Sequence, residues 1–165
     1  MLHTSKKTKE KIIEDLLLQK YNQYYRLAYS YVHNDDDAAD IVQNGAYRAI
    51  KNCHTLKQPE FAGTWVYRIM LNEIFAFCKQ HKTEPLDLVT EEPHSEDIYE
   101  DIDLKRALNE LSANDRMIIE LKYFEDMKFE DIASIMGENV STIKSRLYRS
   151  LKKLKLDLKD DWVFS

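Results

Sequence analysis

The sequence is poor in the residues that shape tight turns, disulfide-bonded scaffolds and membrane spans. Its 165 residues include three glycines, three prolines and two cysteines. Cys53 and Cys78 are too few for a disulfide framework. No apolar run reaches the roughly 18 residues of a membrane helix, and the polar, lysine-rich start does not resemble a secretory signal. We therefore expect a cytoplasmic protein.

The residues that are abundant favour helices. Hydrophobic residues make up 44% of the chain and charged residues 32%, which is enough for one or two small domains. Straight-chain residues are frequent, and they keep much of their side-chain freedom in a helix. No run alternates apolar and polar residues in the manner of a strand. The composition therefore predicts an all-α protein.

Two helical blocks flank an acidic segment. Apolar spacing in the first block predicts helices over residues 17–32, 38–50 and 61–79, with a loop at 52–60. Asn34 and the three acids after it predict a helix start, and Ser112 with Asp115 predicts another in the second block. The acidic stretch has few apolar residues and predicts a flexible linker. We therefore predict two small helical domains, 1–83 and 103–165, joined by an acidic linker at 84–102.

Residues 131–155 predict a helix-turn-helix. A short helix with an apolar face is followed by Gly137, which tolerates the positive φ of such a turn. Ile143 and Leu147 share the apolar face of the next helix, whose start is capped by either Asn139 or Ser141. The opposite face is basic and carries hydroxyl groups, as a helix that reads the major groove requires.

The net charge of the chain bears on how strongly this helix can bind DNA alone. It is −5, with a pI near 5.6, whereas proteins that bind DNA alone are usually basic because neutralising phosphates supplies much of the affinity. An acidic chain with one basic helix predicts weak DNA binding by itself. We therefore expect a larger partner to bring it to DNA.

Separate parts of both blocks resemble the extracytoplasmic-function sigma factors of bacterial RNA polymerase. The resemblance covers most of the chain except the N-terminal arm, the linker and the extreme C-terminus. The segments 37–43 and 61–72 are similar to sigma region 2. The segments similar to sigma region 4 are 107–112, 123–125, 130–133 and 142–147.

The resemblance implies an alternative sigma factor, a promoter-specificity subunit that is not an enzyme and needs no cofactor. In the family, the first domain binds the clamp helices of the polymerase β′ subunit, and it opens and reads the −10 promoter element. The second domain lies under the β flap and reads the −35 element. A bound inhibitor, an anti-sigma factor, is also implied.

The candidate −35 contacts lie on the second helix of the helix-turn-helix. Arg149 has the forked geometry that fits a guanine edge, Lys144 suits a guanine or a phosphate, and Arg146 and Lys152 would neutralise phosphates. The full candidate set is Ser141, Thr142, Lys144, Ser145, Arg146, Tyr148, Arg149 and Lys152.

The candidate −10 contacts lie in the first domain. Aromatic side chains of the third helix (Trp65, Tyr67, Phe75, Phe77) suit stacking on unpaired bases, although aromatics at helical spacing are more often core. The resemblance also places a pocket for a flipped base in the loop at 52–60. The candidate set is Asn52, Lys57, Trp65, Arg68, Asn72, Lys79 and Lys82.

The candidate polymerase contacts lie on the second helix. Acid and amide side chains there suit basic residues of the clamp, and the set is Asp37, Asp40, Gln43 and Asn44. Asn44 stands where the family usually has an acid, and Gly45 after it is a poor helix former, so the resemblance implies a weaker polymerase contact here.

Two other functions fit parts of the sequence. A one-component regulator would combine an effector-binding helical domain with the helix-turn-helix and bind DNA as a dimer without polymerase. A metal-dependent helical enzyme would use the ligands His33, His54, Asp35, Asp36, Asp37 and Asp40. Neither these residues nor the pair Cys78 and His81 has the spacing of a known metal site, so we predict no metal.

Overall fold

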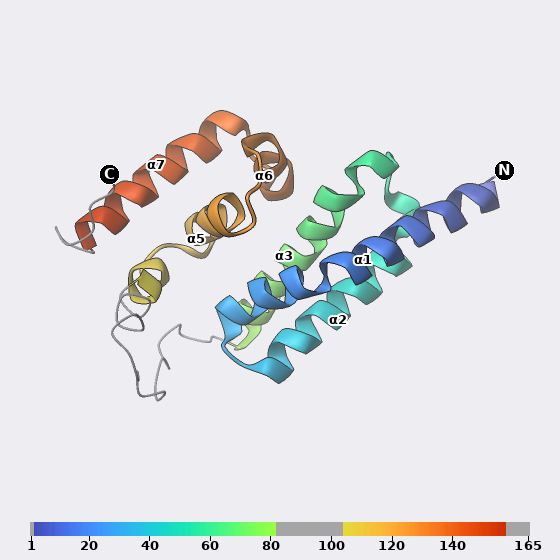
Figure 1. Cartoon of the computed structure of the whole chain (residues 1–165), viewed down its shortest axis with the longest axis horizontal. Helices are drawn as coiled ribbons and strands as arrows, with labels where there is room; N and C mark the ends of the chain where they lie inside the picture. Colours follow the sequence, from blue (N-terminus) through green and yellow to red (C-terminus); the bar gives the residue numbers. More distant parts are fainter. Residues whose placement is uncertain (1, 82–103, 158–165) are drawn as a thin grey trace. The chain divides into compact units, whose positions relative to one another are not determined.

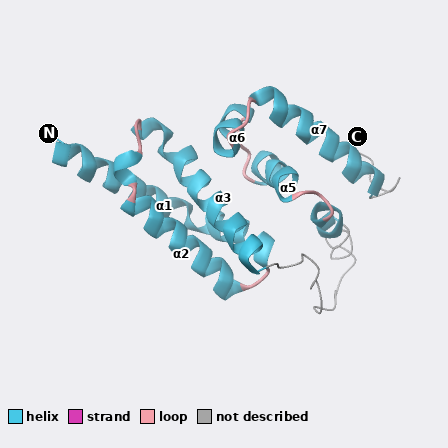
Figure 2. Ribbon diagram, turned by 180° about the vertical axis from the view of Figure 1, so that it is seen from behind, coloured by secondary structure: helices cyan, strands magenta, loops and turns pink. Residues whose placement is uncertain are grey.

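The computed structural model describes residues 2–81 and 104–157 of the chain, and the regular structure of these residues is entirely helical (Figure 1). The chain divides into two compact units, residues 1–84 and 85–165. The predicted all-α, two-domain fold is confirmed, whereas the predicted linker at 84–102 lies outside the described residues. Short loops join the helices within each unit (Figure 2). None of the described helices is long and apolar enough to cross a membrane.

The first unit is built from three helices that pack on one another (Figure 1). They are α1 (Leu2–Val32), α2 (Asp35–Lys51) and α3 (Ala62–His81). Its core includes Tyr24, Ile41, Met70 and Ile74, all of which are buried. Helix α1 begins well before the predicted residue 17. No glycine or proline interrupts its first half, and an ion pair between Lys11 and Asp15 at 3.2 Å links successive turns of this half.

The predicted start of α2 is confirmed. The Asn34 side chain accepts a hydrogen bond from the backbone N–H of Asp37 at 2.9 Å, and Asp35, Asp36 and Asp37 occupy the first turn. The cap satisfies an N–H group that has no partner within the helix, and the acids lie near the positive end of the helix dipole.

Gly45 has a packing role that the sequence did not reveal. It is buried, and a Cβ atom at this position would overlap Met70 Sδ of α3 and lie 3.1 Å from Met70 Cε. The glycine at this position therefore leaves room for the Met70 side chain where α2 packs on α3.

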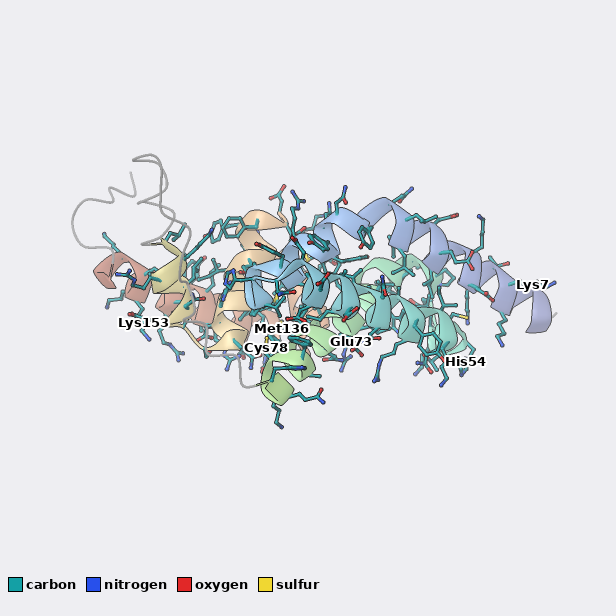
Figure 3. All side chains as sticks on the ribbon, turned by 90° about the horizontal axis from the view of Figure 1, so that it is seen from below. Lys7, His54, Glu73, Cys78, Met136 and Lys153 are labelled. Carbon is teal, nitrogen blue, oxygen red and sulfur yellow. The ribbon has the colours of Figure 1, made fainter. Side chains whose placement is uncertain are left out.

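The segment between α2 and α3 is more ordered than the predicted loop. It contains two short 3-10 turns, Cys53–Thr55 and Pro59–Phe61. Cys53 and Leu56 are buried and anchor the segment to the first unit. The residues around these two anchors remain exposed, including His54 (Figure 3).

The second unit carries the helix-turn-helix. After a helical segment at 104–109 come α5 (Ala113–Ile119), a π-helical turn (Glu120–Phe124), α6 (Phe129–Met136) and α7 (Val140–Asp157). Helix α7 packs on both α5 and α6. Buried residues of these three helices and of the π-helical turn form the core: Met117, Ile118, Leu121, Ile132, Ile143 and Leu147.

The predicted turn and cap residues of the second unit are confirmed. Gly137 ends α6 in the left-handed conformation with φ 68°, and the backbone N–H of Asp115 donates to Ser112 Oγ at 3.2 Å. Of the two candidate caps of α7, Asn139 is the one used, because its side chain accepts from the Thr142 N–H at 2.8 Å. These local contacts set where α5 and α7 begin and where α6 ends.

A buried ion pair stabilises the second unit. Arg116 and Glu120 are 8% and 4% exposed, and Arg116 Nε donates to Glu120 Oε1 at 3.0 Å. The same guanidinium donates to Asn109 Oδ1 at 2.6 Å. A charge this deeply buried requires both a counter-charge and hydrogen bonds, and this guanidinium has both.

Candidate nucleic-acid interface

Helix α7 divides into a buried face and an exposed face, as predicted. Ile143, Leu147 and Leu154 are buried, and Leu151 is half-buried. On the opposite face, most of the predicted DNA contacts are exposed, and Tyr148 shows 60% of its surface. Thr142 is half-buried. The exposed members of the predicted set are Ser141, Lys144, Ser145, Tyr148, Arg149 and Lys152, with Lys153 also exposed on α7 (Figure 3).

Two basic residues of α7 interact with other helices of the second unit. Lys144 Nζ lies 5.3 Å from the ring centroid of Phe129 in α6, on which Lys122 also lies at 4.3 Å. This cation–π contact holds the exposed Lys144 near the start of α7. Arg146 is half-buried, and its Nε lies 3.7 Å from Asp115 Oδ1 in α5. Arg146 therefore differs from the exposed members of the set.

The candidate −10 residues of α3 gather along one side of the helix. Arg68, Asn72 and Lys79 are exposed, and Trp65, one turn before Arg68, is half-buried. Positions separated by three, four and seven residues share one face of a helix. The structure thus brings together four residues of the predicted set, while Lys82 lies outside the described residues.

The structure separates the aromatic residues of α3 into different roles. Tyr67 is buried, packs edge-on against Tyr24 at 5.0 Å between ring centroids, and donates to Gln23 Oε1 at 3.1 Å. Tyr67 is therefore part of the core, the role that aromatics at helical spacing more often have. Phe75 packs edge-on against Tyr31, and Phe77 stacks on His81 at 3.9 Å. Trp65 keeps part of its ring accessible.

The two candidate residues of the 52–60 segment differ in how they are held. Asn52 ends α2, and its side-chain N–H donates to the Arg48 carbonyl at 3.0 Å. The backbone carbonyl of Asn52 accepts a hydrogen bond from Thr55 Oγ1 at 2.7 Å. Lys57 follows the buried Leu56 and is exposed. Asn52 therefore shapes the segment, and Lys57 presents a charge on it.

An exposed tyrosine of α2 lies beside the residues of the predicted polymerase patch. Asp40, Gln43 and Asn44 are exposed, and Asp37 is half-buried. Tyr47 follows Gln43 by one turn and is 65% exposed, with Lys51 Nζ 5.7 Å from its ring centroid. An apolar ring at helical spacing from polar neighbours was the sequence signal that would have identified it.

A tyrosine joins the end of α1 to the start of α2. The Tyr25 hydroxyl donates to the Asp35 carboxylate, and the Tyr25 ring stacks between Tyr21 and Tyr29. The hydrogen bond to Asp35, with smaller contributions from burial and the nearby negative charge, raises the pKa of Tyr25 to about 12. The contact helps fix the start of α2, the helix that carries the predicted polymerase patch.

The described residues contain no group of three His, Cys, Asp or Glu side chains placed to hold a metal ion. His33 interacts with the Tyr29 ring, and His54 is exposed on the 52–60 segment. In the described part of the chain, the alternative of a metal-dependent enzyme therefore has no ligand cluster on which to rest.

A three-helix unit with an acidic helix face, together with a helix-turn-helix unit, defines a class of two-module transcription proteins. The family model described as Sigma-70 region 2 matches residues 16–84, and the one described as Sigma-70, region 4 matches residues 101–154. The chain belongs to the extracytoplasmic-function sigma factors of the sigma-70 family.

Individual relatives agree with this family. RNA polymerase sigma factor SigV of Bacillus subtilis (strain 168) is 42% identical over 157 residues, which are 93% of this chain and 95% of that protein. The ECF RNA polymerase sigma factor SigW of the same organism is 26% identical, over 84% of each chain. The fold is similar to that of the sigma factor RpoE from Bartonella quintana, solved with the anti-sigma factor NepR. The TM-score is 0.70 at 28% identity, covering 90% of this chain and 98% of that one.

The predicted function is therefore confirmed at the level of the family. The chain is an alternative sigma factor, a class of protein that directs RNA polymerase to promoters.

Proposed function

We propose that the two units divide promoter recognition between them. The exposed face of α7 reads the −35 element as duplex DNA, and the side of α3 with the 52–60 segment opens and reads the −10 element. The observation that carries this proposal is the two-faced α7, in which an apolar face is buried on α5 and α6 while basic and hydroxyl groups face solvent. A helix docked in this way presents its outer face to a major groove.

The chemistry of α7 supports readout of bases and of phosphates. Arg149 is exposed and supplies a forked pair of donors for guanine O6 and N7, and Lys144, held over Phe129, supplies a second cation near the helix start. The start of α7 also presents backbone N–H groups suited to a phosphate. The remaining members of the candidate −35 set are Ser141, Thr142, Ser145, Tyr148 and Lys152, with the half-buried Arg146, which contacts Asp115.

The chemistry of α3 suits a single strand. The accessible part of Trp65 offers a ring for stacking, while Arg68, Asn72 and Lys79 supply donors and charge along the same side. Asn52 and Lys57 extend this surface onto the 52–60 segment, where a base separated from its partner would be held. Lys82 stays a proposed contact outside the described residues.

Core RNA polymerase is the proposed main partner. Asp37, Asp40, Gln43 and Asn44 on α2 face the basic clamp helices of β′, and the exposed ring of Tyr47 supplies apolar contact area beside them. The second unit lies under the β flap. The net charge of −5 fits this division, because the polymerase supplies most of the attraction to DNA.

An anti-sigma factor is the proposed regulator. This proposal is supported by the structural neighbour RpoE, which was solved in complex with the anti-sigma factor NepR. The sigma factor acts in the cytoplasm, as a specificity subunit without chemistry of its own and without a cofactor.

Run-off transcription with core polymerase tests the proposed promoter recognition. We expect specific transcripts only when the chain is present, and we expect Arg149→Ala to abolish start-site selection while polymerase binding persists. Normal initiation by that variant on the wild-type promoter would show that α7 does not read the −35 element. A chain that ignores polymerase yet binds duplex DNA tightly as a dimer would instead be a one-component regulator.

A further inference from the structure

One basic residue of α7, Arg146, is half-buried and contacts another helix of the same unit. Arg146 follows the buried Ile143 by three residues and precedes the buried Ser150 by four, so it lies at the edge of the buried face. Lys144 and Tyr148 lie on the other side of the helix, whereas the exposed Arg149 and Lys153 follow Arg146 by three and seven residues. What sets Arg146 apart from these exposed cations is its contact with α5.

The partner of Arg146 lies in the first turn of α5. Arg146 Nε is 3.7 Å from Asp115 Oδ1, and the two side chains are 32% and 30% exposed. Asp115 Oδ1 itself is shielded from solvent and accepts no hydrogen bond from the residues that the structure describes. At 3.7 Å the contact is an ion pair and not a hydrogen bond. A carboxylate oxygen in this position depends on the nearby guanidinium for its compensation.

We propose that Asp115 is a positioning residue for −35 recognition, and that Arg146 is a strut between α7 and α5 that makes no phosphate contact. The inference rests on the proposed role of α7 in reading the −35 element. The pair joins the helix that reads DNA to the helix beneath it, and so fixes the rotation of α7 about its own axis. That rotation decides which bases of the −35 element Arg149 and Lys144 can reach.

The strut and a phosphate contact predict different behaviour. If Arg146 is a strut, removing either member of the pair has the same effect, and removing both adds little, because the same interaction is lost each time. The salt dependence of promoter binding is then unchanged, since no phosphate contact disappears. A phosphate contact would instead contribute about one unit to the slope of log K against log salt concentration.

The test uses holoenzyme reconstituted from core polymerase and the full chain, on one promoter with its −35 element and on a matched template in which that element is scrambled. The variants are Asp115→Asn, Arg146→Gln, their combination, and Lys152→Gln as the matched phosphate-contact control. We expect each single variant of the pair to reduce initiation from the intact promoter roughly five- to tenfold, and the combination to reduce it by the same factor. Initiation from the scrambled template should not change.

Salt titration of promoter binding separates the two roles. The magnitude of the slope of log K against log salt concentration should decrease by about one for Lys152→Gln and stay at the wild-type value for Arg146→Gln. Arg146→Lys keeps the positive charge of the ion pair, so under the strut model it should initiate closer to the wild type than Arg146→Gln does. Circular dichroism checks that each variant is folded. If Arg146→Gln does not fold, Asp115→Asn carries the comparison, because a strut predicts reduced initiation and a phosphate contact predicts tighter promoter binding.

Three results would overturn the proposal. They are a lower salt slope in Arg146→Gln, tighter promoter binding in Asp115→Asn because a released Arg146 reaches the backbone, and strictly additive effects of the two single variants. A different result would remove the proposed function itself: wild-type holoenzyme that initiates equally well on both templates. The two failures are therefore distinguishable.

Discussion

Replacing Gly45 with alanine sets a gain in helix propensity against a steric clash. In an exposed helix interior this substitution stabilises by about 1 kcal/mol. Gly45 is buried, however, and the new Cβ would overlap Met70 Sδ and lie 3.1 Å from Met70 Cε. Met70 is 1% exposed, so its side chain has little free space into which to move.

The magnitude follows from the balance of these two effects. Inserting a methyl group into a packed core costs about 1–3 kcal/mol. Subtracting the propensity gain leaves a net loss of roughly 0–2 kcal/mol in the free energy of unfolding of the first unit. Gly63→Ala is the matched control, because a Cβ at Gly63 meets no atom within 4 Å. That variant should be stabilised by about 0.4–1 kcal/mol.

Urea unfolding, followed by far-UV circular dichroism, measures both variants. A second cycle with Met70→Ala tests the cause, because the shorter side chain makes room for the methyl group. Gly45→Ala should then cost less in the Met70→Ala background than in the wild type, a coupling of about 0.5–3 kcal/mol. If Gly45→Ala stabilises the protein as much as Gly63→Ala does, the packing argument is refuted.

Two further predictions concern the buried ion pair and the raised tyrosine pKa. Arg116→Met leaves the Glu120 carboxylate buried without its counter-charge, and should destabilise the second unit by about 3–5 kcal/mol. Thermal unfolding measures this loss of stability. A loss below about 1 kcal/mol would contradict the prediction. Tyr25 has a pKa of about 12, above the value near 10 of an unfolded chain. Its protonated form is therefore favoured by folding, so its stabilising contribution is complete below pH 10 and is lost as the pH rises through 12. Titration of tyrosinate absorbance should show one ionisation near pH 12 in the wild type that Tyr25→Phe lacks. If Tyr25→Phe instead lacks an ionisation near pH 10, the Tyr25 hydroxyl is not hydrogen-bonded to Asp35.

Local signals predicted the helices and their ends well. Asn34, Ser112 and Gly137 were recognised because capping and left-handed turns depend on contacts within a few residues. The two faces of α7 followed from the spacing of Ile143 and Leu147 for the same reason. The early start of α1 was missed because its first half is too polar to show an apolar stripe, although nothing in it breaks a helix.

The candidate site was predicted less completely, because a side chain's role depends on neighbours distant in the chain. Tyr67 looked like a ring available for stacking until Tyr24 and Gln23 were seen to enclose it. Tyr47 was overlooked, although its spacing of four residues from Gln43 places it on the polar face of α2. Spacing places residues on one face of a helix, but it does not say which neighbouring helix covers that face.

The sequence by itself determined the helical class, the helix-turn-helix and the acidic balance that calls for a larger partner, since these depend on composition and on spacings of a few residues. Tertiary structure alone decided that Gly45 makes room for Met70, that Arg116 and Glu120 are buried together, and that Arg146 faces Asp115. Each of these depends on which helices pack together. Such packing is set by the fit of whole helix surfaces and by the removal of apolar area from water, neither of which can be read from a single segment.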